Sequence, residues 1–112
     1  MSDDAAAKIA ARLTEVWRIS RPTVLERINL LHSSCDRLSH NPDDTEARTE
    51  GFEAAHKLSG VLGVFGMPLG SEIASGIEFM LKSDRPLSPG DLSTLRHQIA
   101  DLDAVIASKA DR

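Results

Sequence analysis

Apolar residues recur along this chain at alternating steps of three and four, and this spacing constrains the fold more than any other feature. Five stretches show it, with apolar positions at Ala6, Ile9, Leu13 and Val16; Val24, Ile28, Leu31, Cys35 and Leu38; Ala55, Leu58, Leu62 and Phe65; Leu69, Ile73, Ile77 and Met80; and Leu92, Leu95, Ile99, Leu102 and Ile106. A period near 3.6 is typical of amphipathic helices. Because none of the stretches alternates at period two, the sequence predicts an all-α fold.

Short polar or Pro/Gly segments separate these stretches: "SRP", "HNPDD", "GMP" and "SDRPLSPG". Connections this short make neighbouring helices antiparallel. We therefore expect one domain, an up-down-up-down antiparallel four-helix bundle over residues 20–112, with an additional N-terminal helix over residues 1–19 that packs on it. The final helix is predicted to begin with a capping box in which Ser88 is the N-cap, Pro89 the first helical residue and Asp91 the returning acceptor.

Composition restricts the compartment and the partners. A chain of 112 residues is long enough to bury one core. Its single cysteine excludes an internal disulfide, and no run of about 18 apolar residues indicates a membrane span or a signal peptide. The formal charge is −4, and the basic residues are scattered rather than clustered. We expect a cytoplasmic protein that binds neither nucleic acid nor membrane.

His56 lies on the polar side of the third predicted helix. At about 100° per residue, it stands roughly 140° from the centre of the apolar stripe, so the spacing predicts an exposed imidazole. Ser59, Gly60 and Gly63 share that side, and all three are small. A helix-interior glycine costs about 1 kcal/mol relative to alanine, which local propensity does not justify. The pattern favours close approach of another protein to an exposed, nucleophilic histidine.

The segment "AHKLSGVLGVFGMPLGSEIASGIE", residues 55–78, resembles the histidine-containing phosphotransfer (HPt) domains of two-component phosphorelays. That family's pattern is met by His56, Leu58, Gly60, Gly63 and Gly66. The resemblance implies that His56 accepts a phosphoryl group from a receiver-domain aspartate and passes it to a response-regulator aspartate. It also implies a monomer without kinase activity of its own and without a bound cofactor, because the receiver domain holds the Mg²⁺.

The residues around His56 leave two roles open. Many family members carry lysine at the third place after the histidine, where this chain has Ser59, with its lysine at Lys57 instead. Lys57 and Ser59 are predicted to support the ring or its phosphate, unless the partner supplies the cation. Phe52, one turn before His56, is either a rim contact of the core or part of a docking surface with Gly60 and Gly63.

Other functions are weighed against this one. His32, Cys35 and Asp36 share a helix, but Cys35 falls on its apolar stripe, so we expect no metal site. No glycine-rich phosphate loop or second nucleophile accompanies His56, which disfavours an enzyme. The alternative is a non-catalytic helical adaptor that docks on a signalling partner without being phosphorylated. The initial Met and the complete set of helices favour a free-standing chain.

Overall fold

The structure, a computed structural model, describes residues 2–110 and places them in four helices joined by short connections. The helices are α1 (Ser2–His40), α2 (Thr45–Val64), α3 (Pro68–Lys82) and α4 (Pro89–Ala110). No strand occurs in this part of the chain. The all-α prediction is therefore confirmed.

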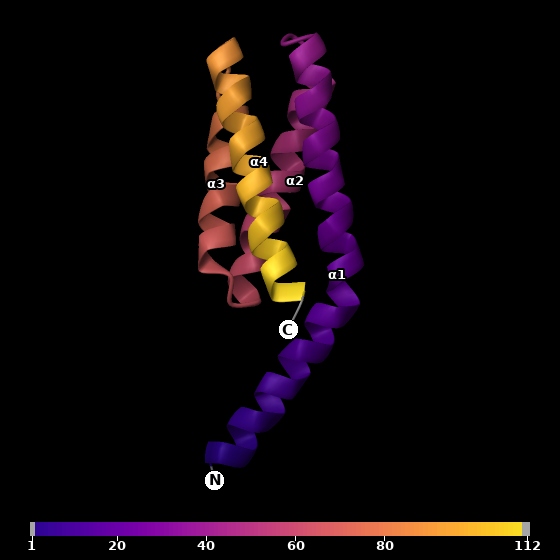
Figure 1. Ribbon diagram of the computed structural model, residues 1–112, viewed down its shortest axis with the longest axis vertical. Coiled ribbons are helices and arrows are strands. Elements are labelled where there is room, and N and C mark those ends of the chain that lie inside the picture. Colours follow the sequence, from indigo (N-terminus) through magenta and orange to yellow (C-terminus); the bar gives the residue numbers. More distant parts are fainter. Residues whose placement is uncertain (1, 111–112) are drawn as a thin grey trace.

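The C-terminal half of α1 lies beside the other three helices, and the chain reverses direction at each connection (Figure 1). The helix α2 contacts α1 and α3, while α4 contacts α3 and α1. The core between them is aliphatic, and its largest fully buried apolar side chains are Val24, Leu31, Leu38, Leu58, Leu62, Ile77, Leu95, Ile99, Leu102 and Ile106. These are positions of the predicted apolar stripes, because each stripe turns inward.

The separate N-terminal helix expected over residues 1–19 is replaced by one continuous helix of 39 residues with Pro22 inside it. A proline in a helix interior removes one backbone hydrogen bond and tends to kink the helix, but it need not end it. Figure 1 shows α1 changing direction where it leaves the bundle. The expected boundary between residues 19 and 20 thus lies within α1.

The first turns of α1 extend beyond the bundle, and the structure is 56 Å long against 20 Å in width. Residues 4–16 are exposed, including Ile9 and Leu13 of the first apolar stripe. Packing on the bundle begins at Trp17, whose ring meets Phe65 edge-on with the ring centroids 5.2 Å apart. The predicted contact between the N-terminal segment and the bundle is limited to this end.

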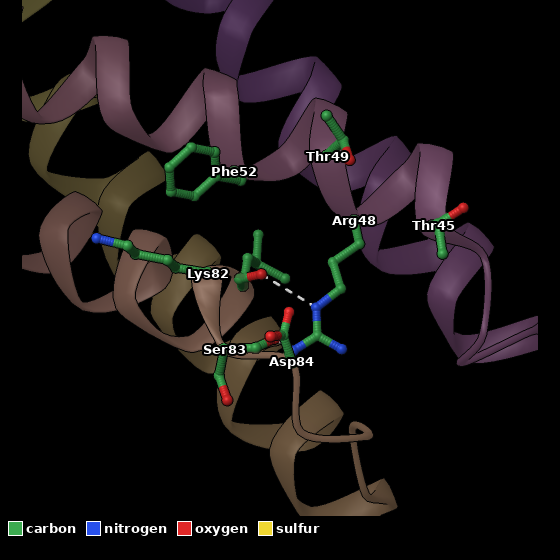
Figure 2. Close-up of a pocket in the computed structure, with 8 residues that line it drawn as sticks. Thr45, Arg48, Thr49, Phe52, Lys82, Ser83 and Asp84 are labelled. Carbon is green, nitrogen blue, oxygen red and sulfur yellow. Dashed lines mark hydrogen bonds between the residues drawn. The ribbon is translucent and has the colours of Figure 1, made fainter.

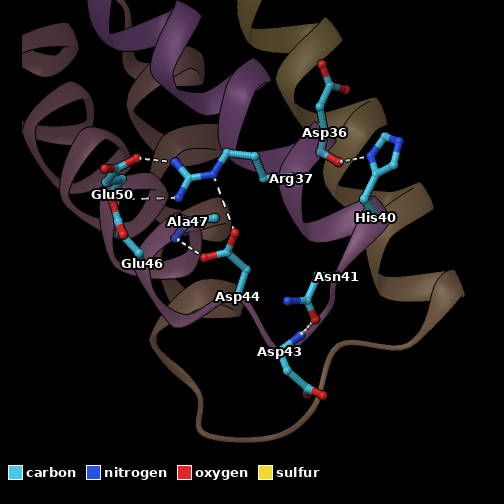
Figure 3. Close-up of polar contacts among 9 residues, drawn as sticks. All are labelled: Asp36, Arg37, His40, Asn41, Asp43, Asp44, Glu46, Ala47 and Glu50. Carbon is cyan, nitrogen blue, oxygen red and sulfur yellow. Dashed lines mark hydrogen bonds and ion pairs between the residues drawn. The ribbon is translucent and has the colours of Figure 1, made fainter.

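Polar side chains fix the point at which α2 begins (Figure 3). Asp44 is the N-cap of α2 and accepts a hydrogen bond from the backbone N–H of Ala47 at 2.9 Å. The Arg37 guanidinium, near the end of α1, contacts Asp44 at 3.5 Å and Glu50 at 2.7 Å. Capping carboxylates satisfy helical N–H groups that have no other partner. These contacts tie the start of α2 to α1 and so set which way its faces point.

The other helix ends follow recognisable local chemistry. Gly66 has φ of +73°, a conformation that side chains disfavour, and it turns the chain between α2 and α3. At the start of α4, Ser88 Oγ accepts from the Asp91 N–H at 3.0 Å and Asp91 Oδ2 accepts from the Ser88 N–H at 2.9 Å. The predicted capping box is confirmed.

Candidate functional site

His56 stands in the middle of α2, on the side turned away from the core. Its side chain is 69% exposed, whereas Ala55 and Leu58 on the opposite side are fully buried. The helix is anchored by those buried side chains, so the imidazole is held on a rigid element. An exposed ring on a rigid helix is accessible to a partner without any rearrangement of the fold.

Glu78 on α3 orients the imidazole. Its Oε2 lies 2.9 Å from His56 Nδ1, and its side chain is only 23% exposed. A carboxylate only accepts hydrogen bonds, so the neutral ring must carry its proton on Nδ1. Nε2 then bears the lone pair, and it has no hydrogen-bond partner among residues 2–110. The ring therefore presents the nucleophilic Nε2 to solvent, while Nδ1 on its other side is bound to the Glu78 carboxylate.

Phe52 is a rim contact of the core, the first of the two roles that the sequence left open for it, and it also touches the imidazole. It is partly buried and packs against the core, as a rim residue does. Its ring also stacks on His56 at 15° between planes, with the centroids 6.2 Å apart. Phe52 thus links the core to one face of the imidazole.

Ser59 is engaged with α3 rather than directed at the ring. Its Oγ lies 2.6 Å from Ser75 Oγ, and its backbone carbonyl accepts a hydrogen bond from Ser71 Oγ at 2.7 Å. These bonds join α2 to α3 directly beside His56. In this structure Ser59 holds the two helices together at the site.

Lys57 lies on another side of α2. It is exposed and lines a groove between α1 and α2 with Glu26, Glu50 and Glu53. His56 instead faces α3, through Glu78. The structure does not bring Lys57 to the side of the helix that carries the imidazole–carboxylate pair.

Gly60 and Gly63 have no side chains, so the surface beside His56 is not obstructed there. A Cβ added to Gly60 would have no heavy atom within 4 Å, and one added to Gly63 would touch only Ser71, at 3.6 Å. Neither glycine is needed to let another helix of this chain approach. The space above them is open to a partner.

Lys82 is a further basic residue near the site that the sequence did not single out. It lies with Phe52 in a hollow of about 350 Å³ between α2 and the C-terminal end of α3, shown in Figure 2. Arg48, in the same hollow, donates from Nε to the Leu81 carbonyl at 3.0 Å and also binds the Ser83 carbonyl. Arg48 thereby satisfies carbonyls at the end of α3, which have no partner within the helix.

The residues weighed as metal ligands are engaged elsewhere. His32 Nε2 lies 2.7 Å from Asp103 Oδ2, and Asp36 binds Arg96 at 3.1 Å. Cys35 is buried, and that burial raises the pKa of its thiol. Within residues 2–110 there is no group of three or more His, Cys, Asp or Glu side chains arranged to hold a metal ion.

Comparison with known proteins assigns the family. Residues 7–105 match the sequence profile of the Hpt domain, so the chain belongs to the Hpt domain family. It is also 30% identical over 86 residues to Protein RcaC of Microchaete diplosiphon, a match that covers 77% of this chain and 13% of RcaC. No solved structure matches the chain.

Family membership carries a general function. Hpt domains transfer phosphoryl groups through a histidine in two-component signalling, lack kinase activity of their own and interact with receiver domains of kinases and response regulators. The resemblance to HPt domains is therefore confirmed.

None of the described helices is long and apolar enough to cross a membrane.

Proposed function

We propose that His56 is the phosphoacceptor of this Hpt domain. It takes a phosphoryl group from the aspartyl phosphate of one receiver domain and passes it to the aspartate of a response regulator. The observation that carries the proposal is the exposed imidazole whose Nδ1 is held by Glu78 at 2.9 Å while Nε2 faces solvent. None of the other three histidines of the chain lies in a comparable setting beside glycines that leave the surface open.

The transfer is a displacement at phosphorus. The Nε2 lone pair of His56 attacks the aspartyl phosphate, an N–P bond forms, and the P–O bond breaks with its electron pair leaving on the aspartate carboxylate. The ring keeps its Nδ1 proton and becomes positively charged. In the second half, a receiver carboxylate attacks phosphorus and the electron pair of the N–P bond returns to Nε2. Catalysis of such a step depends mainly on positioning and on electrostatic stabilisation.

Glu78 both positions the His56 ring and stabilises its charge. Its hydrogen bond fixes the tautomer and the direction of the ring, and its charge offsets the positive charge that develops on the imidazole. Glu78→Gln should therefore slow transfer by about tenfold or more while leaving the helices intact. Nitrogen NMR of the ring provides an independent reading, because the preference for a proton on Nδ1 should weaken in the variant.

The docking surface consists of Phe52, Gly60 and Gly63 around His56. Its open glycines let a receiver approach the ring closely, and a carrier must release each partner, so a modest interface fits. The receiver brings the Mg²⁺, and this chain brings the nucleophile. We assign this exchange to the cytoplasm.

The test is intact-mass analysis after mixing the protein with a phosphorylated receiver domain and Mg²⁺. We expect one acid-labile phosphoryl group on the wild type, none on His56→Gln, and one on His97→Gln. His97 is the matched control because it is also exposed on a helix, with Nδ1 only 2.9 Å from the local Ser93 carbonyl. A label that persists in His56→Gln would contradict the proposal. No label on the folded wild type with any receiver would favour the non-catalytic adaptor.

A further inference from the structure

Phosphorylation of His56 creates an electrostatic conflict with the carboxylate that orients it. A phosphoryl group carries about −1.5 to −2 charges near neutral pH, as phosphorylated side chains do. Glu78 is bound to the same ring, so the single positive charge that the ring gains on phosphorylation would face a carboxylate on one side and the phosphoryl group on the other. One positive charge does not balance both anionic groups, and they destabilise each other unless a second cation lies nearby. The need for that cation rests on the proposed function of His56.

Two basic residues close to His56 in the sequence are poorly placed for this role. Lys57 lies in the groove beside α1 with three glutamates, on a different side of α2 from Glu78. Arg48 is committed to the carbonyls at the end of α3, including that of Leu81 at 3.0 Å. Neither is free to turn toward the imidazole without losing contacts it already makes or leaving its own side of the helix.

Lys82 continues a polar stripe on α3 whose other members all reach toward α2. Ser71, Ser75, Glu78 and Lys82 follow one another at steps of four, three and four, which places them on one side of the helix. Ser71 and Ser75 bond Ser59, and Glu78 bonds His56. Lys82 is therefore on the side of α3 that faces the site, one turn from the residue that holds the ring.

The direction of the Lys82 side chain supports the same placement. Helical side chains tilt toward the N-terminus of their helix, so the stem of Lys82 runs back toward Glu78. In Figure 2 it extends away from Arg48 to the part of the hollow where Phe52 stands. Phe52 is the residue that stacks on His56. Among residues 2–110 Lys82 has no ion-pair or hydrogen-bond partner for its ammonium group, which leaves that group available.

We infer that Lys82 is the positioning cation for the phosphoryl group on His56. The role assigned from sequence to Lys57 and Ser59 is thus divided: Ser59 joins the helices, and the positive charge comes from α3. Lys82 neutralises part of the phosphoryl charge and holds its oxygens away from Glu78. The phosphoryl group is bound to His56 through the N–P bond. Lys82 interacts with its oxygens through charge and hydrogen bonds and forms no covalent bond.

The test uses phosphoramidate, a small phosphoryl donor, so that no receiver is needed. Three variants are compared with the wild type: Lys82→Met removes the charge and keeps the stem, Lys82→Arg keeps the charge, and Lys57→Met is the matched control. We expect Lys82→Met to slow phosphorylation of His56 by about tenfold, Lys82→Arg to restore most of the rate, and Lys57→Met to stay within about twofold of the wild type.

A second readout separates this role from a structural one. A lysine in the last turn also suits the helix dipole, so Lys82→Met is expected to lower thermal stability slightly. Stability alone does not change the protonation of a phosphoryl group. Phosphorus NMR of the phosphorylated protein should show that group taking up its last proton at higher pH in Lys82→Met than in the wild type, because the nearby cation favours the more anionic form.

The outcomes distinguish the two proposals. Wild type labelled on His56, with Lys82→Met unchanged in both rate and phosphorus titration, overturns the role of Lys82 and leaves His56 as phosphoacceptor. An effect confined to Lys57→Met overturns it in favour of Lys57. Wild type that gains no phosphoryl group from phosphoramidate or from any receiver overturns the proposed function and this inference with it.

Discussion

Gly60 is the position where stability and function are expected to move in opposite directions. It lies inside α2 on the exposed side of the helix, and a Cβ added there would meet no heavy atom within 4 Å. Replacing a helix-interior glycine with alanine removes a backbone entropy cost of about 1 kcal/mol. Gly60→Ala should raise the free energy of unfolding by about that amount, and Tm by about 4 °C for a domain of this size.

Gly51 provides the internal comparison for that magnitude. It is also inside α2, but a Cβ there would lie 2.9 Å from a methyl of Leu81 and 3.1 Å from Ser34 Cβ. The methyl can rotate away, whereas Ser34 Cβ is fixed to α1. Overpacking costs about 1–3 kcal/mol, which offsets or exceeds the same entropic gain. Gly51→Ala should therefore be neutral or destabilising where Gly60→Ala is stabilising.

The assay is urea unfolding followed by far-UV circular dichroism, paired with transfer from a phosphorylated receiver. Gly60→Leu should fold and should still accept phosphate from phosphoramidate, yet transfer from a receiver should fall sharply because the larger side chain fills the docking surface. Lower stability of Gly60→Ala than of the wild type, or equal stabilisation by Gly51→Ala, would refute the reasoning about space. Transfer by Gly60→Leu at the native rate would refute the reasoning about docking.

Three further predictions concern the bundle itself. Leu58→Ala, at a fully buried core position, should cost about 2–5 kcal/mol in urea unfolding, and a loss below about 1 kcal/mol would contradict its assignment to the core. The hydrogen bond from the Ser88 N–H holds the pKa of Asp91 below its usual value. The ionised Asp91 carboxylate therefore stabilises the fold fully above the unfolded pKa near 3.9, and this stabilisation is lost as pH falls through the lower pKa of the folded state. Tm should therefore be lower in Asp91→Asn than in the wild type at neutral pH, and the difference should shrink below about pH 4; a constant difference would count against the capping box. Cys35 is buried and the reagent cannot reach it in the folded protein, so iodoacetamide should label it only as fast as the protein unfolds, and rapid labelling of the native protein would show that the thiol is accessible.

Most of the fold could be predicted because its determinants are local. The capping box at Ser88 consists of short-range hydrogen bonds, and sequence spacing alone identifies it. Pro22 misled the prediction because a proline inside a helix removes one backbone hydrogen bond and tends to kink the helix, but it need not end it. Here α1 continues through Pro22 without a break.

The residues of the candidate site also differ in how far they could be predicted, depending on whether they lie on the helix of His56 or on another helix. His56, Gly60 and Gly63 belong to one helix, so their shared side follows from 100° per residue. Glu78 and Lys82 come from α3, and nothing local tells which side of α3 faces α2. The stripe of Ser71, Ser75, Glu78 and Lys82 was visible in the sequence, but a polar stripe at helical spacing equally suits a side exposed to water. What distinguishes the two is tertiary: Ala74 and Ile77 are buried, and that burial rotates the neighbouring stripe against Ser59 and His56. The histidine is thus specified by its own helix, whereas the charge around it depends on how two helices pack.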